Sequence, residues 1–140
     1  MLYLPRALYE QIISHCQQQY PKEACGILAG RDGNVEQVFP MTNLDNSPIS
    51  YTLDPKEQLQ VQRTMEHANL QLLAIYHSHT ATAAYPSSVD VAQASELGVA
   101  LLMPDVRYVL VSLKDRQQPE IKNYTIREGR VVPDDLQLLS

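Results

Sequence analysis

Paired cysteines and long apolar runs are missing from this sequence, and both absences restrict its class. The 140 residues include only two cysteines, Cys16 and Cys25, with neither CxxC spacing nor the density of a secreted disulfide scaffold. Such usage favours a reducing compartment, and we expect the cytoplasm. The N-terminus lacks a basic segment followed by an apolar core, and no stretch approaches about eighteen uninterrupted apolar residues. We therefore expect neither a signal peptide nor a membrane anchor.

Positive charge is also scarce. Eleven Lys and Arg residues stand against sixteen Asp and Glu residues, which gives a formal net charge of −5, and the basic residues form no run. Because a nucleic-acid backbone attracts basic surfaces, we expect no nucleic-acid binding. Apolar residues make up 44% of the chain, enough to build a real core. The length fits a single domain spanning residues 1–140.

Hydrophobic spacing predicts three helices, at 5–19, 55–69 and 88–97. The second has a complete start signal, because Asp54 can cap it, Pro55 suits its first turn and an acid follows three residues after the cap. Ser87 or Ser88 can cap the third helix, and Gly98 is expected to close it.

Turn residues and apolar runs predict strands at 24–30, 35–39, 70–76, 99–103, 108–113 and 121–127. The first two form a hairpin, and the strand at 70–76 is apolar enough to be covered on both faces. A short extended piece is predicted at 51–53, and the pattern after Arg130 is ambiguous. The order of elements lacks a regular βαβ alternation, which favours an α+β fold with a mixed sheet flanked by helices.

Two histidines, His77 and His79, follow the predicted strand at 70–76. In an extended segment, residues two apart point to the same side, so both imidazoles can converge while Ser78 faces away. Asp90 follows eleven residues after His79, in the first turn of the predicted third helix. Two nitrogens and a carboxylate oxygen suit zinc, and a catalytic zinc typically takes three protein ligands. The sequence therefore proposes the zinc site of a hydrolase.

Asp90 also has a purely structural interpretation. Ser87-x-x-Asp90 matches a capping box, with the acid near the positive end of the helix. The HxH spacing is a weak signal by itself. The local pattern thus leaves both interpretations of Asp90 open.

The other histidines and Cys25 suggest no site. His15 and His67 fall inside predicted helices without a partner at metal-ligand spacing, and are expected to be surface or core residues. Cys25 lies in a run of small residues, where a buried thiol acts as a small hydrophobic group.

A zinc hydrolase also needs a group that moves a proton from water to the leaving amine. The HExxH motif that supplies such a carboxylate in other enzymes is absent. Glu23 is the candidate, because it stands at the start of the apolar segment 24–30. An exposed glutamate in a turn is the alternative.

Three separated motifs resemble the JAMM (MPN-plus) metalloprotease family in both residues and spacing. They are Pro21-Lys22-Glu23-Ala24-Cys25-Gly26-Ile27-Leu28, His77-Ser78-His79 and Pro86-Ser87-Ser88-Val89-Asp90. The resemblance covers about residues 4–103. It departs at Thr80, where the family usually has proline. Because Thr80 is not at a ligand position, this departure concerns the shape of the following loop.

The resemblance implies a central curved, mostly antiparallel sheet flanked by helices, with a layering similar to that of cytidine deaminases. It implies one Zn²⁺ per chain held by His77, His79 and Asp90. Glu23 would be the general acid/base, and Ser87 would donate a hydrogen bond to the developing oxyanion. The implied activity is that of a compact prokaryotic peptidase or isopeptidase acting at the C-terminal tail of a ubiquitin-like or sulfur-carrier protein. A homodimer is compatible with this resemblance.

A non-catalytic scaffold or protein-interaction module of the same fold is the alternative. Relatives of that kind usually lack part of the metal set, whereas this chain has all of it, which favours the enzyme.

Other classes of enzyme with an HxH motif fit this sequence less well. An amidohydrolase barrel needs about 250 residues, a cupin needs a histidine beyond His79, the last one here, and a zinc deaminase needs H-x-E with P-C-x-x-C.

Overall fold

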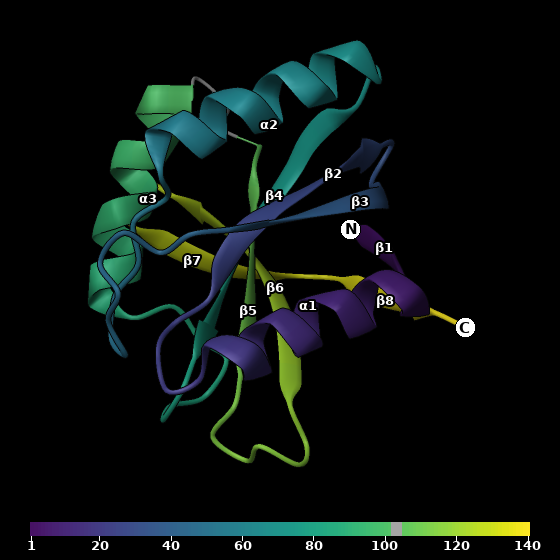
Figure 1. Cartoon of the computed structure of the whole chain (residues 1–140). Helices are drawn as coiled ribbons and strands as arrows, with labels where there is room; N and C mark the ends of the chain where they lie inside the picture. Colours follow the sequence, from purple (N-terminus) through teal and green to yellow (C-terminus); the bar gives the residue numbers. More distant parts are fainter. Residues whose placement is uncertain (102–104) are drawn as a thin grey trace.

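The computed structural model describes residues 1–101 and 105–140, which form an eight-stranded sheet and three helices (Figure 1). The helices are α1 (Arg6–Gln19), α2 (Pro55–His67) and α3 (Ser88–Leu101). The strands are β1 (Leu2–Pro5), β2 (Cys25–Arg31), β3 (Asn34–Met41), β4 (Gln71–His79), β5 (Arg107–Ser112), β6 (Glu120–Arg127), β7 (Arg130–Asp134) and β8 (Leu136–Leu139). The predicted mixed sheet flanked by helices is confirmed.

The strands are ordered β7-β6-β5-β4-β2-β3-β1-β8. Four neighbouring pairs are antiparallel, and three are parallel, namely β1 with β3, β1 with β8 and β4 with β5. The chain passes from β7 at one edge to β8 at the other through Asp135 alone. The carbonyl of Asp135 accepts hydrogen bonds from the Leu2 amide at 3.0 Å and the Asn123 side chain at 3.2 Å. The sheet is therefore curved enough for its two edges to meet at this residue.

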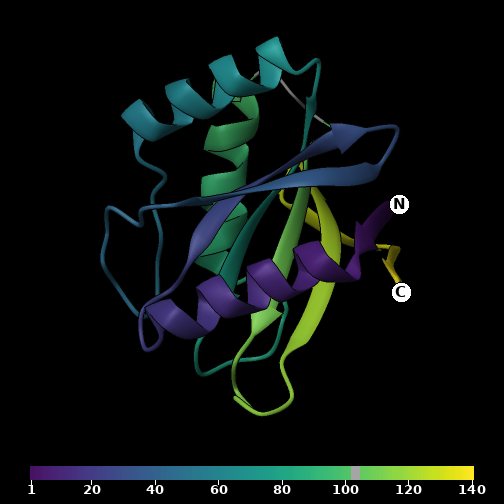
Figure 2. The ribbon, with the colours of Figure 1, turned by 45° about the vertical axis from the view of Figure 1, so that its right-hand side comes forward.

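Two apolar layers cover the two faces of the sheet. One contains Ile12 and Cys16 of α1, and the other contains Met65 of α2 and Ala94 of α3. Figures 1 and 2 show the same division, with α1 on one side and the other two helices on the opposite side. Strand β4 lies between the layers, and its last six residues are buried. The expectation that this strand is covered on both faces is confirmed.

The first two helices and the hairpin lie close to their predicted positions. Helix α1 begins one residue later than predicted, with Pro5 as its N-cap. At the start of α2, the side chain of Asp54 accepts a hydrogen bond from the Lys56 amide at 2.9 Å. Strands β2 and β3 pair in antiparallel register around the turn at 32–33. Gly26 is required in β2, because a Cβ there would lie 2.3 Å from the ring of Tyr76.

The third helix is where the prediction was wrong. Helix α3 continues through Gly98 to Leu101, which removes most of the strand predicted at 99–103, and the remainder lies outside the described residues. Glycine inside a helix costs only about 0.5–1 kcal/mol relative to alanine, so it does not by itself end one.

Three further differences concern strands. Strand β1 was not predicted, the tail forms β7 and β8, and β4 continues three residues beyond the predicted end to include both histidines. The expected piece at 51–53 is reduced to one bridge, between Leu53 and Asn43. Among the described helices, none combines the length and apolar character needed to cross a bilayer.

Candidate metal and catalytic site

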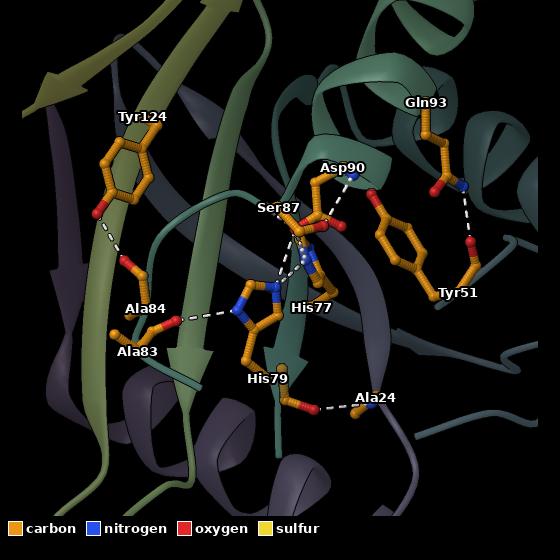
Figure 3. A network of polar contacts seen from close by, with 11 residues as sticks. Ala24, Tyr51, His77, His79, Ala83, Ala84, Ser87, Asp90, Gln93 and Tyr124 are labelled. Carbon is orange, nitrogen blue, oxygen red and sulfur yellow. Dashed lines mark hydrogen bonds and ion pairs between the residues drawn. The ribbon is translucent and has the colours of Figure 1, made fainter. Parts of the chain in front are cut away.

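The alternation of β4 turns both histidines toward α3. Ile75 belongs to the apolar layer beneath α2 and α3, whereas Tyr76 belongs to the layer beneath α1. His77 and His79 therefore share the side of Ile75, and their Nε2 atoms lie 3.3 Å apart. Figure 3 shows the two rings approaching each other beside the first turn of α3.

Asp90 completes a triangle of ligand atoms. Its Oδ2 lies 3.2 Å from Nε2 of His77 and 2.9 Å from Nε2 of His79. All three side chains are buried, with exposed fractions of 1% to 6%. In tetrahedral coordination with zinc–nitrogen bonds of about 2.0–2.1 Å, two ligand atoms lie about 3.3 Å apart. The observed separations approach that spacing, so these three groups could hold a metal ion.

The capping role of Asp90 is also present. The Ser87 amide donates to Oδ2 of Asp90 at 2.9 Å, and the Asp90 amide donates to Oγ of Ser87 at 3.1 Å. This reciprocal pair is a capping box at the start of α3. The two interpretations that the sequence left open are thus compatible, because the bonds that start the helix also aim the carboxylate at the histidines.

Outer partners fix the orientation of His79. Its Nδ1 lies 2.9 Å from the Ala83 carbonyl, which can only accept, so Nδ1 carries a proton and Nε2 is the nitrogen that faces the cluster. Ser78 faces away, as expected. Its amide donates to the Ala24 carbonyl at 3.0 Å, and its hydroxyl accepts from the Ala24 amide at 2.8 Å. These bonds hold the residue after Glu23 against β4.

Burial and hydrogen bonding shift the pKa values of the three clustered groups in different directions. Burial lowers the pKa of His77, and its hydrogen bond to Asp90 offsets this only in part. For His79 burial also acts downward, but hydrogen bonds to Asp90 and the Ala83 carbonyl outweigh it and raise the pKa. Burial would raise the pKa of Asp90, yet the hydrogen bonds from both histidines and from the Ser87 amide hold it well below its ordinary value. Asp90 is therefore ionised, as a cation ligand must be.

Glu23 is buried rather than exposed in a turn, with an exposed fraction of 4%. Both polar groups of its backbone are hydrogen-bonded. The amide donates to the Ser47 carbonyl at 2.9 Å, and the carbonyl accepts from the Asn43 side chain at 3.1 Å. Its Oε1 has no hydrogen-bond partner among the described residues. Burial raises the pKa of Glu23 to about 8, while the charge of His79 acts in the opposite direction. A buried carboxyl that binds a proton near neutral pH can serve as a general acid/base.

Ser87 is the one exposed residue of the five, since the other four are buried. Its side chain is exposed, and its oxygen accepts the bond from the Asp90 amide, which leaves the hydroxyl proton to be donated elsewhere. All five residues singled out in the sequence therefore meet at one end of β4.

The residues expected to have no role contribute no ligand atom to the cluster found among the described residues. Nδ1 of His15 is hydrogen-bonded to the Tyr76 hydroxyl at 2.7 Å, and His67 is exposed at the end of α2. Cys25 is buried, and burial raises the pKa of its thiol to about 12. Thr80 donates to the Pro48 carbonyl at 3.3 Å, so it connects the loop after β4 to the loop at 43–53.

Sequence reasoning missed two residues in that second loop. Asn43 closes the loop, because its side chain binds the Ser50 carbonyl and the amides of Asp45 and Thr52 in addition to Glu23. The ring of Tyr51 stacks on His77. No motif marks either position. Asn43 could have been noticed only as an asparagine entering a turn-rich segment, where side-chain bonds to the backbone are common.

The chain is similar to known proteins in sequence and in fold. Residues 5–127 match the family described as prokaryotic homologs of the JAB domain. The chain is 43% identical over 134 residues to the CysO-cysteine peptidase of Mycobacterium tuberculosis, covering 94% of this chain and 87% of that protein. It is 42% identical over 95 residues to a probable TtuB-protein conjugate cleaving protease of Thermus thermophilus, covering 67% of this chain and 64% of that protein. A solution structure from Desulfitobacterium hafniense matches with a TM-score of 0.87 and 36% identity, over 99% of this chain and 93% of that one.

Proposed function

Since this chain belongs to the family of prokaryotic homologs of the JAB domain, we propose that it is a zinc-dependent peptidase acting on the C-terminal tail of a ubiquitin-like or sulfur-carrier protein. The observation that carries the proposal is the buried triangle of His77, His79 and Asp90 beside an acid that binds a proton near neutral pH. The relatives named for CysO-cysteine and for TtuB conjugates support this class of substrate.

Each proposed role follows from the position of the residue. His77, His79 and Asp90 would hold the zinc ion, which when bound lowers the pKa of water and polarises a carbonyl. Glu23 would take the proton of the attacking water and give it to the leaving amine, because its carboxyl lies close enough for the charges of His79 and Asp90 to act on it. Ser87 would donate its hydroxyl proton to the oxygen on which negative charge develops.

Zinc analysis together with cleavage of a carrier protein bearing a C-terminal extension tests this function. We expect about one zinc ion per chain, cleavage that stops when a chelator removes the metal, and recovery when zinc is returned. A protein that binds no zinc, or that cleaves equally well after chelation, would contradict the proposal. Zinc binding without cleavage of any carrier would instead indicate a scaffold of the same fold.

Ser87→Ala should lower kcat by about 10²–10³-fold, since one lost oxyanion donor typically costs that much. The same change removes the acceptor for the Asp90 amide, so α3 should also lose about 1 kcal/mol of stability. The measurement is kcat at full zinc occupancy, with zinc content determined on the same sample.

Ser88→Ala is the matched control for this replacement. Ser88 is the next residue, is also exposed and is not part of the capping box. Its kcat should remain within about twofold, as expected for a surface change away from special features. An unchanged kcat in Ser87→Ala would remove Ser87 from the mechanism.

A further inference from the structure

Tyr51 lies against the face of His77. The two ring centroids are 4.4 Å apart and the ring planes differ by 25°, which is a stacked arrangement. The exposed fraction of Tyr51 is 2%. Figure 3 shows its ring beside both His77 and Asp90. The contact therefore joins the loop at 43–53 directly to the metal-binding cluster.

The two histidines differ in how their rings are oriented. His79 is anchored through Nδ1 to the Ala83 carbonyl. Nδ1 of His77 is buried and has no hydrogen-bond partner among the described residues. Metal-binding histidines usually use the second nitrogen to fix the ring. For His77, the stacked ring of Tyr51 is a contact that can restrict rotation about χ2, in addition to the hydrogen bond between Nε2 and Asp90.

Tyr51 is itself held firmly by its backbone. Its carbonyl accepts a hydrogen bond from the Gln93 side chain of α3 at 2.7 Å. The next residue, Thr52, donates from its amide to the Asn43 side chain at 3.1 Å and accepts from the Leu44 amide at 2.9 Å. A ring fixed in this way presents a rigid surface to its neighbour.

We propose that Tyr51 is a positioning residue, whose ring holds His77 in the orientation that points Nε2 toward His79 and Asp90. This inference rests on the proposed metal site but not on the substrate. The aromatic face is the required feature, and the hydroxyl is not. Removing the ring should weaken metal binding because His77 must then be ordered at the moment of binding, whereas Tyr51→Phe should preserve it.

Zinc affinity, measured by competition with a chromophoric chelator, tests the proposal without reference to catalysis. Tyr51→Leu and Tyr51→Met should each raise the Kd for zinc by about 10-fold or more, the range found when outer partners of metal ligands are removed. Tyr51→Phe should stay within about twofold of the unaltered protein, because it keeps the ring.

Tyr108→Leu is the control for general damage to the core. Tyr108 is 3% exposed and lies in the same apolar layer, and its hydroxyl donates to the Ala94 carbonyl at 3.4 Å rather than to a ligand side chain. This variant should be destabilised to urea about as much as Tyr51→Leu while its Kd for zinc is unchanged. Equal zinc affinities of the Tyr51→Leu and Tyr108→Leu proteins would overturn the proposal, and so would a loss in Tyr51→Phe as large as in Tyr51→Leu. An unaltered protein that binds no zinc would overturn the proposed function instead.

The stacking can also be tested by NMR on the unaltered protein, so this test does not depend on whether a variant folds. Nuclear Overhauser contacts between the rings of Tyr51 and His77 should be present without metal and should persist when zinc is added. Their loss on zinc addition would mean that His77 turns to bind the ion, and would overturn the proposal.

Discussion

Glu23→Gln protein is expected to bind zinc as tightly as the unaltered protein and to cleave its substrate about 10²–10⁴-fold more slowly, the usual contribution of a general acid/base. Glutamine has nearly the shape of glutamate but cannot accept and return a proton. Glu23 is not one of the three clustered ligand residues, so the metal should remain. Single-turnover cleavage and zinc content, measured on the same sample, check both parts.

Glu36→Gln is a suitable control for the loss of one negative charge. Glu36 is exposed on β3, and its ion pair within the described part of the chain is a long one with Arg31, at 3.7 Å. Its cleavage rate should not change. If Glu23→Gln cleaves at the rate of this control, Glu23 is not the proton carrier.

Although Glu23→Gln should slow cleavage, it should stabilise the metal-free protein. Burial raises the pKa of Glu23 from 4.5 to about 8, so the folded protein binds this proton more tightly than the unfolded chain does. The contribution of Glu23 to the free energy of unfolding therefore falls as pH rises through this interval. Glutamine has no proton to lose, so the stability advantage of the variant should grow over the interval and become constant above it. A pH-independent difference in urea unfolding would contradict the assigned burial of the carboxyl.

Asp90→Asn protein should lose zinc affinity by more than about 100-fold, because removal of an outer partner alone costs about 10–100-fold and Asp90 is proposed to be a direct ligand. Cleavage should disappear with the metal. An asparagine oxygen can still accept the hydrogen bond from the Ser87 amide, so the start of α3 should remain. Metal titration followed by urea unfolding separates these effects.

Asp90→Ala completes the comparison. It removes both the proposed ligand and the acceptor for the Ser87 amide, and should cost about 1 kcal/mol more in unfolding free energy than Asp90→Asn. Equal stabilities of the two variants would mean that the capping bond contributes nothing. Retention of tight zinc binding in either variant would remove Asp90 from the ligand set.

The sequence predicted those parts of the fold that depend on local signals. The start of α2 follows from Asp54 and Pro55, and the hairpin of β2 and β3 follows from its turn. Strand β1 could not be predicted in the same way, because its four residues gain their partners from β3 and β8, which are distant in sequence. The predicted end of α3 was wrong because we expected Gly98 to end the helix, whereas a single glycine is not sufficient to do so.

The candidate site shows the same division. The convergence of His77 and His79 could be predicted from the alternation of side chains along a strand. The position of Asp90 could be predicted from its place at the start of a helix. The burial of Glu23 depends on the loop at 43–53, whose path is set by the side-chain bonds of Asn43. Tyr51 could not be found, because its contact with His77 joins two segments that no sequence period connects.

The pairing of β2 with β4 determines when during folding this site can form. Cys25 pairs with His77, more than fifty positions away, and Glu23 lies just before that pair. Closing so long a loop is slow and entropically costly compared with forming a helix, so the separate segments of the site meet only after the central sheet has formed. Metal binding by this chain should thus follow folding rather than initiate it, unlike in a zinc finger. Bound zinc would then slow unfolding far more than it speeds refolding. The ion would therefore increase the kinetic stability of the folded protein without helping it to fold.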